Sequence, residues 1–291
     1  MSFVFPHRDG LSRPTGAARR PLPSLLRRGG LACWRAVAFY SCLVALGVLL
    51  LGGCLVSGVL TRVLPPHYRH ASGRSLISWC ARTFFQLTEV LGLVRLDLSA
   101  LDVLNTERGL IIAPNHPSML DALLIASRVR RTGCIMKAGL WNNPFLGAGA
   151  RLAGYIRNDS VNSMIRQAAA DLSRGDKVLI FPEATRSSTP TSVNPLTAGI
   201  ALIAQRAGAP IQTVLIEAES AYLCKGWPLF RRPTFPLRYR VTLGPRFVVQ
   251  SERHRTLAAM QHFFADNLAA GIGHWTVPAS AHRIATALSD V

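Results

Sequence analysis

Two short polar clusters, each directly after an apolar run, contain the residues of this sequence that are best suited to chemistry. In the first, the apolar run Leu110–Ala113 leads to His116, and Asp121 follows shortly after. A carboxylate that binds one ring nitrogen of a histidine leaves the other nitrogen free to remove a proton from an attacking group. The pair therefore indicates a general base and its orienting carboxylate. Ser118 and Asp121 also fit a capping box, which would give Asp121 a purely structural role.

The second cluster consists of Glu183, Thr185 and Arg186, which follow the apolar run Val178–Phe181. An arginine guanidinium is a planar fork suited to a phosphate or a carboxylate, and a glutamate can accept from a substrate hydroxyl or hold the arginine in place. The alternative is an exposed ion pair, which contributes little. Lys137 follows a third strand-like run. Because open α/β sheets place ligands at the carboxyl ends of strands, we expect these side chains at one cleft.

The sequence offers no pattern for a bound metal ion or an organic cofactor, and we expect neither. The spacing of the six cysteines excludes a CxxC motif, so we expect reduced, buried thiols rather than a disulfide framework or a zinc site. The glycine-rich nucleotide loops, the GxSxG serine motif and the HExxH zinc motif are absent. Their absence disfavours nucleotide-dependent phosphoryl transfer, serine hydrolysis and zinc proteolysis.

The elements that must position these side chains follow an α/β pattern. From about residue 96 to residue 250, short β-like runs alternate with helix-like stretches. Such alternation predicts helices packed on a largely buried sheet. We therefore expect a catalytic domain at 96–250 with a mixed sheet flanked by helices. A C-terminal helix, capped by Ser251, and a tail should make up residues 251–291.

An apolar segment precedes this domain. Residues 36–60 carry no charge, and as a helix they would span roughly 37 Å, more than the hydrocarbon core of a bilayer, about 30 Å. The segment either crosses the membrane once or is broken at Gly52-Gly53 into two short helices that dip in and return. Basic residues flank it on both sides, which mildly favours the dipping form.

The regions beside this segment complete the N-terminal part of the chain. Residues 1–35 are rich in Arg, Pro and Gly and show no apolar period, which predicts a flexible basic arm. Residues 75–94 mix large apolar side chains with a few polar ones, which predicts an amphipathic helix at the membrane or on the catalytic domain. We therefore expect membrane-associated helices at 36–95.

The charge of the chain indicates an anionic partner. Lys and Arg number 33 against 15 for Asp and Glu, which gives a net charge of +18. Such a charge suits nucleic acid, an anionic membrane surface or a phosphorylated substrate. The basic residues are scattered without a basic-aromatic recognition motif, so we do not expect nucleic acid. Hydrophobic residues make up 49% and charged residues 16%, which favours the membrane.

Four motifs in order resemble those of the glycerolipid acyltransferases. Residues 116–121 match the HxxxxD motif of that family, and residues 181–187 match its FPEGTRS motif. Residues 137–154 are similar to its middle segment, and residues 209–214 to its final strand motif. The resemblance covers residues 96–225.

The resemblance implies transfer of an acyl group from acyl-CoA or acyl-ACP to a lysolipid hydroxyl, most often that of 1-acylglycerol-3-phosphate, in phospholipid biosynthesis. His116 would be the base, Asp121 its partner, and Glu183 and Arg186 would bind the acceptor. No covalent acyl-enzyme and no metal would be involved. An apolar groove would hold the acyl chain, with Trp141 and Phe145 in its wall. The expected location is the bacterial inner membrane, with the catalytic domain on the cytoplasmic face.

The sequence also departs from the family at positions that bear on the acceptor. Ala184 replaces the usual Gly, and Arg157 comes earlier than the arginine of the middle segment. Thr197 stands where a Lys is often found. Two cationic contacts to a phosphate are thereby weakened, so a different lysolipid or a specialised hydroxylated lipid stays open as the acceptor. A non-catalytic, membrane-tethered basic protein is the alternative from another class.

Overall fold

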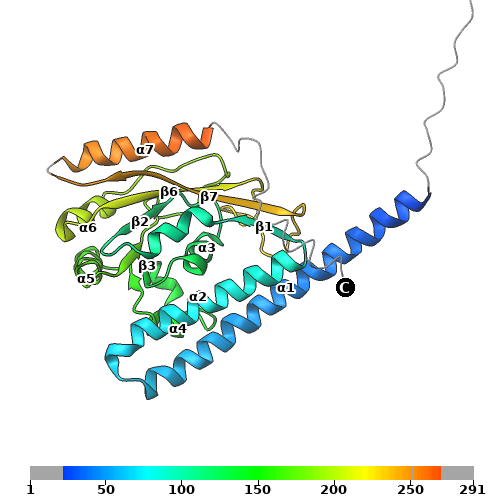
Figure 1. The fold of residues 1–291 in the computed structure, drawn as a ribbon, viewed down its shortest axis with the longest axis horizontal. Helices are drawn as coiled ribbons and strands as arrows, with labels where there is room; N and C mark the ends of the chain where they lie inside the picture. Colours follow the sequence, from blue (N-terminus) through cyan, green and yellow to red (C-terminus); the bar gives the residue numbers. More distant parts are fainter. Residues whose placement is uncertain (1–21, 251, 270–291) are drawn as a thin grey trace, which may run out of the picture.

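The computed structural model describes residues 22–250 and 252–269, which form three layers (Figure 1). A mixed sheet of seven strands lies between two groups of helices, as the sequence predicted. The predictions for residues 1–21, for the cap at Ser251 and for the tail from 270 concern residues outside the described ranges. The strands are β1 (Val94–Asp97), β2 (Ile111–Pro114), β3 (Thr132–Met136), β4 (Ile156–Arg157), β5 (Lys177–Leu179), β6 (Ile211–Ala218) and β7 (Leu237–Phe247).

The helices surround this sheet on both faces. The long helices α1 and α2 lie together along one face with α3, while α5, α6 and α7 lie on the other (Figure 1). Their bounds are α1 (Leu22–Val63), α2 (Pro66–Val90), α3 (Asp121–Arg128), α4 (Gly147–Leu152), α5 (Val161–Ser173), α6 (Gly199–Ala207) and α7 (Arg253–Ala269). Two short 3₁₀ helices are η1 (Ser99–Asn105) and η2 (Ala138–Leu140).

The sheet brings the ends of its parallel strands to one edge. Its order is β1-β7-β6-β2-β5-β3-β4, and the five strands from β6 to β4 in this order run parallel. β7 is antiparallel to β6, and β1 is parallel to β7. The residues that follow β2, β5 and β3 therefore lie at the same edge. His116, Glu183 and Lys137 follow those three strands, respectively.

Alternate residues of the central strands point to the two helical layers. In β2, Ile112 belongs to the core on the side of α1, α2 and α3, whereas Ile111 and Ala113 belong to the core on the side of α5 and α6. This is the period of two that a strand imposes on its side chains. All three residues are fully buried, as expected for a strand covered on both faces.

The N-terminal helices form an antiparallel hairpin, which corrects three expectations. α1 begins at Leu22, so residues 22–35 belong to a helix and not to a flexible arm. It continues through Gly52-Gly53, and the chain turns only at 64–65, so the mildly favoured alternative, a break at the glycines, is wrong. A glycine costs a helix only about 1 kcal/mol, and α1 is held along its length by α2 and α4. Proline is favoured at a helix start, and α2 begins at Pro66, ahead of the predicted residue 75.

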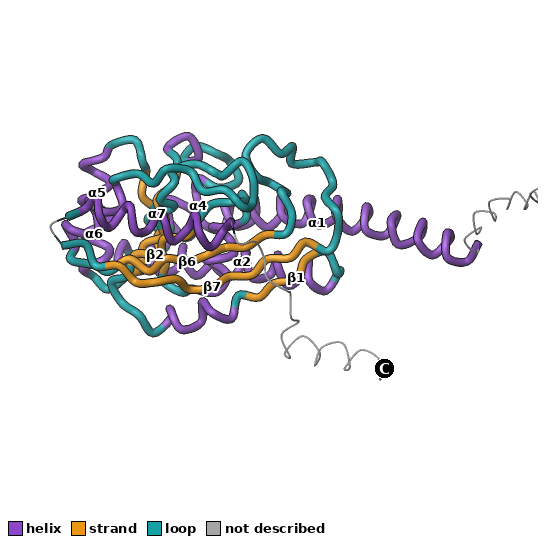
Figure 2. The backbone as a smooth tube through the Cα atoms, turned by 90° about the horizontal axis from the view of Figure 1, so that it is seen from above, coloured by secondary structure: helices purple, strands orange, loops and turns teal. Residues whose placement is uncertain are grey.

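The two sides of α1 have different surroundings although both are apolar. One side packs into the protein through residues such as Phe39 and Cys42. The N-terminal end of α1 extends beyond the rest of the molecule (Figures 1 and 2). Exposed large apolar residues recur along the other side at helical spacing, and we call them the outer stripe: Val37, Tyr40, Val44, Val48, Leu51, Leu55, Val59 and Val63.

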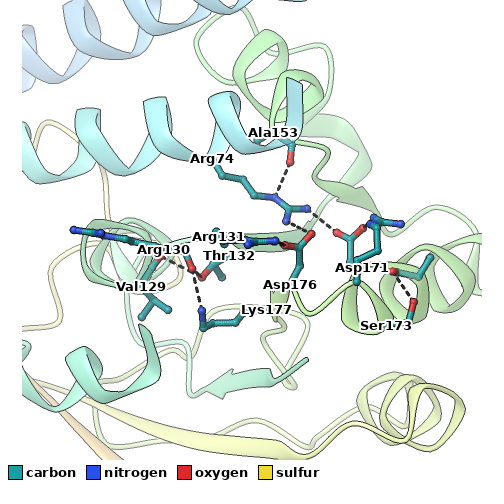
Figure 3. Close-up of polar contacts among 12 residues, drawn as sticks. Arg74, Val129, Arg130, Arg131, Thr132, Ala153, Asp171, Ser173, Asp176 and Lys177 are labelled. Carbon is teal, nitrogen blue, oxygen red and sulfur yellow. Dashed lines mark hydrogen bonds and ion pairs between the residues drawn. The ribbon is translucent and has the colours of Figure 1, made fainter. Parts of the chain in front are cut away.

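A buried arginine fixes α2 to the catalytic domain (Figure 3). Arg74 is 5% exposed, and its two terminal nitrogens lie 2.7 Å from Asp171 Oδ2 and 2.8 Å from Asp176 Oδ2. Its Nε donates to the carbonyl of Ala153 at 3.0 Å. The neighbouring Gly73 lies so close to this chain that an added Cβ would come within 2.4 Å of the Ala153 nitrogen. The joint between hairpin and domain is therefore closely packed and paired in charge.

The cysteines are unpaired, and their burial follows the prediction with one exception. Cys42, Cys54, Cys80, Cys134 and Cys224 are buried free thiols. Cys33, near the N-terminal end of α1, is exposed. Among the described residues, no group of His, Cys, Asp and Glu side chains could hold a metal ion.

Candidate active site

His116 and Asp121 meet in the turn between β2 and α3. The Nδ1 atom of His116 lies 2.8 Å from Asp121 Oδ2. Asp121 is the first residue of α3 and is fully buried, while the His116 side chain is 18% exposed. The described residues provide no partner for His116 Nε2. This ring nitrogen is therefore free to receive a proton from a bound molecule, with the carboxylate holding the other side of the ring.

One oxygen of Asp121 serves both roles that the sequence suggested. Oδ2 accepts the backbone N–H of Ser118 at 2.8 Å as well as the contact from His116. The Ser118 contact gives Asp121 a local structural role beside the orienting one, but the N-cap of α3 is Leu120, so the predicted capping box does not form. Oδ1 is buried without a hydrogen-bond partner among the described residues. Burial raises the pKa of Asp121 to about 6, against the opposing effects of the His116 hydrogen bond and charge and of the Ser118 N–H.

Glu183 lies beneath His116 and binds the protein itself. Its Oε1 accepts the backbone N–H of His116 at 2.8 Å. Its Oε2 accepts the Ser187 hydroxyl at 2.9 Å and both the backbone and the side-chain nitrogens of Asn194, at 2.7 and 2.8 Å. The residue is only 3% exposed. These contacts favour a role in positioning His116 over the predicted contact with the acceptor.

Three further residues that the sequence did not single out also hold His116. The backbone N–H of Ser187 donates to the His116 carbonyl at 2.8 Å, and the ring of Phe181 stacks on the His116 ring with centroids 3.9 Å apart. Asn115 is buried and forms two hydrogen bonds with the backbone of Ile216 in β6, at 2.7 and 2.9 Å. For Asn115, an amide side chain directly before His116 was a signal that the sequence offered. The contacts of Ser187 and Phe181 with His116 could be found only from the fold.

The predicted cations and the threonine lie around this centre. Arg186 Nη1 donates to the Leu223 carbonyl at 2.9 Å, so the loop after β6 holds this side chain, and no described ion pair joins it to Glu183. Thr185 is exposed in the same turn. Lys137 is exposed at the carboxyl end of β3. Arg157, at the end of β4, pairs with Asp159.

An apolar cavity of about 350 Å³ lies between the hairpin and the domain, beside this centre. Met119 and Leu120, from the turn between His116 and Asp121, line one part of it. Phe145 lines it as predicted, but Trp141 does not: Arg157 lies over the Trp141 ring, 5.5 Å from its centroid. Other walls come from Leu46 and Leu49 of α1, Phe84 of α2, Leu123 of α3 and Leu223.

A histidine–carboxylate pair at a sheet edge, beside an apolar cavity, suits an enzyme that activates a hydroxyl next to an apolar chain. The family model for acyltransferases matches residues 95–217, the part of the chain that holds this site. This match and the similar protein described next support an acyltransferase domain in the part of the chain that holds the site.

Similar proteins are known in both sequence and structure. The chain is 24% identical over 234 residues to a 1-acyl-sn-glycerol-3-phosphate acyltransferase of Pseudomonas aeruginosa, covering 78% of this chain and 85% of that protein. Its fold matches the crystal structure of the 1-acyl-sn-glycerophosphate (LPA) acyltransferase PlsC from Thermotoga maritima with a TM-score of 0.61 and 17% identity. That match covers 83% of this chain and 96% of the other.

Proposed function

We propose that this enzyme transfers a fatty acyl group from acyl-CoA or acyl-ACP to the free hydroxyl of 1-acylglycerol-3-phosphate, at a membrane face, in phospholipid biosynthesis. The observation that carries the proposal is the 2.8 Å contact between His116 and the buried Asp121, in a turn that also lines the apolar cavity. The relative from Pseudomonas aeruginosa, named for this acceptor, supports the choice of substrate.

The reaction needs one proton carrier and no covalent enzyme intermediate. His116 Nε2 removes the proton of the acceptor hydroxyl as its oxygen attacks the thioester carbonyl. Asp121 holds the Nδ1 side of the ring and stabilises the imidazolium that forms. When the tetrahedral intermediate collapses, the C–S bond breaks and the imidazolium returns its proton to the thiolate. The products are the ester and the free thiol, so protons and electrons balance.

The cavity suits the acyl chain, and Arg186 and Lys137 suit the phosphate. A long alkyl chain gains about 0.8 kcal/mol for each buried CH₂, and the cavity walls are almost entirely apolar. On the polar side, Arg186 lies in the turn that also carries Glu183, and Lys137 lies at the same sheet edge. Arg186 presents a guanidinium of which one nitrogen is already fixed by Leu223, an arrangement that orients the remaining donors toward an acceptor phosphate.

The hairpin is best explained as a helix pair that lies in one face of a bilayer. Among the described residues, one helical stretch, Gly30–Val63, has the length and composition to cross a membrane. Yet its inner side lies against the domain from Ala38 to Ser57, which are both buried, so lipid cannot surround it there. Only the outer stripe can enter the apolar phase, as in an interfacial helix. We place the catalytic domain, residues 96–250, on the cytoplasmic face of the bacterial inner membrane.

The test is acyl transfer by the membrane-bound protein, measured by mass spectrometry of the lipid product. His116→Ala should lower turnover by roughly 10²- to 10⁴-fold, because the base is lost. The matched control is His254→Ala, on α7, which should keep full turnover. Retained transfer in a folded His116→Ala variant would exclude the proposed base. Transfer to other lysolipids but not to 1-acylglycerol-3-phosphate would correct the acceptor.

A further inference from the structure

The loop from Lys225 to Arg232 combines an exposed aromatic side chain with three cations. Phe230 is 70% exposed, more than any other phenylalanine among the exposed large apolar residues. Lys225, Arg231 and Arg232 are exposed on the same loop, and no acidic residue occurs between 220 and 235. An apolar side chain surrounded by cations is the composition of a segment that enters an anionic bilayer surface. We call residues 225–232 the portal loop.

The portal loop is joined to the outward part of α1. Arg232 Nη1 donates to the Ala32 carbonyl at 3.2 Å, and the Tyr40 hydroxyl donates to the Phe230 carbonyl at 3.4 Å. Tyr40 belongs to the outer stripe. The aromatic side chain of the loop therefore continues the apolar surface that the hairpin presents, although nearly two hundred residues of sequence separate them.

The portal loop is also joined to the active site and to the cavity. The Lys225 N–H donates to the Ser187 carbonyl at 3.0 Å, while the Ser187 N–H donates to His116. Just before the loop, the Leu223 carbonyl accepts from Arg186 Nη1. Leu229, in the middle of the loop, lines the apolar cavity. The loop thus reaches from the exposed apolar surface to the cavity wall and to the residues that hold His116.

Contacts inside the loop hold its shape. The Trp227 indole N–H donates to the Arg231 carbonyl at 3.1 Å, and the Arg231 guanidinium lies over the Trp227 ring, 4.9 Å from its centroid. Pro228 and Pro233 restrict the backbone further. These contacts hold the loop in a conformation that exposes Phe230. Its exposure is therefore a defined feature of the loop.

We propose that the portal loop is a second membrane-binding element, which inserts Phe230 into an anionic phospholipid bilayer and binds lipid phosphates through Lys225, Arg231 and Arg232. It would place the part of the cavity wall at Leu229 next to the bilayer, so that lipid substrates pass between membrane and site without crossing water. The role of the loop in the passage of lipid substrates rests on the proposed function. The physical claim is the insertion of the loop, which can be measured without turnover.

The first experiment measures depth. In the full-length protein, Phe230→Trp provides a fluorophore whose quenching by brominated lipids is recorded in vesicles of phosphatidylcholine and phosphatidylglycerol. Val248→Trp, at a residue 65% exposed beyond β7, is the matched control. We expect added quenching at residue 230 above the native tryptophans and none at residue 248. Equal quenching at the two positions would overturn the proposal.

The second experiment measures separately how the cations and the apolar side chain of the portal loop contribute to vesicle binding. Phe230→Asp and the double variant Arg231→Gln, Arg232→Gln should each weaken binding to these vesicles, the latter by roughly 10- to 30-fold at low salt. The control removes two exposed arginines of α5 and α6, as Arg166→Gln, Arg206→Gln, and should change binding by less than about threefold. Loss of a concentration-dependent dimer in Phe230→Asp, with vesicle binding unchanged, would assign the loop to a protein partner instead and refute insertion.

The two proposals can fail independently. Both binding experiments are repeated in the His116→Ala background, in which the base is absent. Weakened binding there supports the portal loop whether or not acyl transfer follows the proposed mechanism. Normal vesicle binding by Phe230→Asp, in a protein that loses turnover with His116→Ala, would reject the loop and keep the reaction.

Discussion

Glu183 Oε1 lies 2.8 Å from the backbone nitrogen of His116, so a carboxylate at the end of β5 positions the histidine at the end of β2. The other oxygen of Glu183 is occupied by Ser187 and Asn194. The residue therefore joins the loop after β2 to its own loop, between β5 and α6, at the edge of the sheet where the chemistry is proposed. Its charge is compensated by donors from the protein and is not offered to a substrate.

Because of these contacts, the substitution Glu183→Ala tests whether Glu183 positions His116 or binds the substrate. Removing the carboxylate leaves buried donors unpaired, each at a cost of about 1–3 kcal/mol, so the melting temperature should fall together with kcat. Thermal unfolding and kinetics of the same preparation would measure both. A rise in acceptor KM with unchanged melting temperature and kcat would instead support direct contact with the acceptor.

The His116–Asp121 pair predicts a pH dependence of turnover. Because the pKa of Asp121 is raised to about 6, turnover should fall as the pH is lowered through that value and the pair takes up a proton. Asp121→Asn should remove this acidic limb and lower kcat by at least about tenfold. A kcat profile from pH 5 to 9 on both proteins would show it.

The same carboxyl affects stability with the opposite sign. A pKa that is higher in the folded protein than in the unfolded chain means that the folded state binds the proton more tightly, so the stabilisation is present at low pH. It is lost as the pH rises from the ordinary aspartate value toward about 6. Denaturant unfolding should therefore show that Asp121→Asn gains stability relative to the wild type between these values.

Ala184 predicts a stabilising substitution. Its φ is 53°, in the left-handed region where a side chain costs roughly 1–2 kcal/mol, and the related motif has glycine at this position. Ala184→Gly should raise the melting temperature. The control is Ala169→Gly inside α5, which should lower it, because glycine costs about 1 kcal/mol in a helix. Equal effects of the two substitutions would contradict strain at Ala184.

Arg186 and Thr197 predict how the acceptor phosphate is bound. Arg186→Ala should raise the KM for 1-acylglycerol-3-phosphate and leave that for the thioester nearly unchanged, since a hydrogen bond to a charged group contributes about 1.5–3 kcal/mol. Thr197 is exposed and donates to the Pro182 carbonyl at 3.1 Å, so Thr197→Lys would place a cation beside the same turn. It should lower that KM. Equal losses for Arg186→Ala on a neutral lysolipid would argue against phosphate binding.

The outer stripe of α1 predicts where the hairpin meets lipid. Val48 and Leu55 are 66% and 67% exposed, and Val48→Asp with Leu55→Asp should shift the protein from the membrane to the soluble fraction without unfolding it. Val161→Asp on α5 is the control, at 58% exposure. Fractionation with a circular dichroism check would measure this, and an unchanged distribution would exclude the stripe as the membrane contact.

The sequence predicted contacts between residues that are close together in the chain, but not contacts between residues that are far apart in it. His116 and Asp121 lie five residues apart, and their meeting followed from a local strand-to-helix pattern. The role of Glu183 did not, because the sheet order brings it to His116, 67 residues away, and the path of its own long loop brings it to Asn194. Likewise, the hydropathy of α1 showed a long apolar run but not where it turns, since packing against α2 and α4 stabilises the helix through Gly52-Gly53.

The ion pairs of Arg74 make the hairpin an integral part of the folded enzyme and not only a flexible tether. Trimming residues 22–90 to obtain a water-soluble protein would remove the buried partner of Asp171 and Asp176, leaving them only the exposed Arg174 and Arg131, and would open the cavity along its length. Solubility has to come from the outer stripe instead. In the proposed membrane placement, the closely packed joint makes the depth of α1 in the lipid set the height of His116 above it. Bilayer thickness and lateral pressure thereby become variables of catalysis.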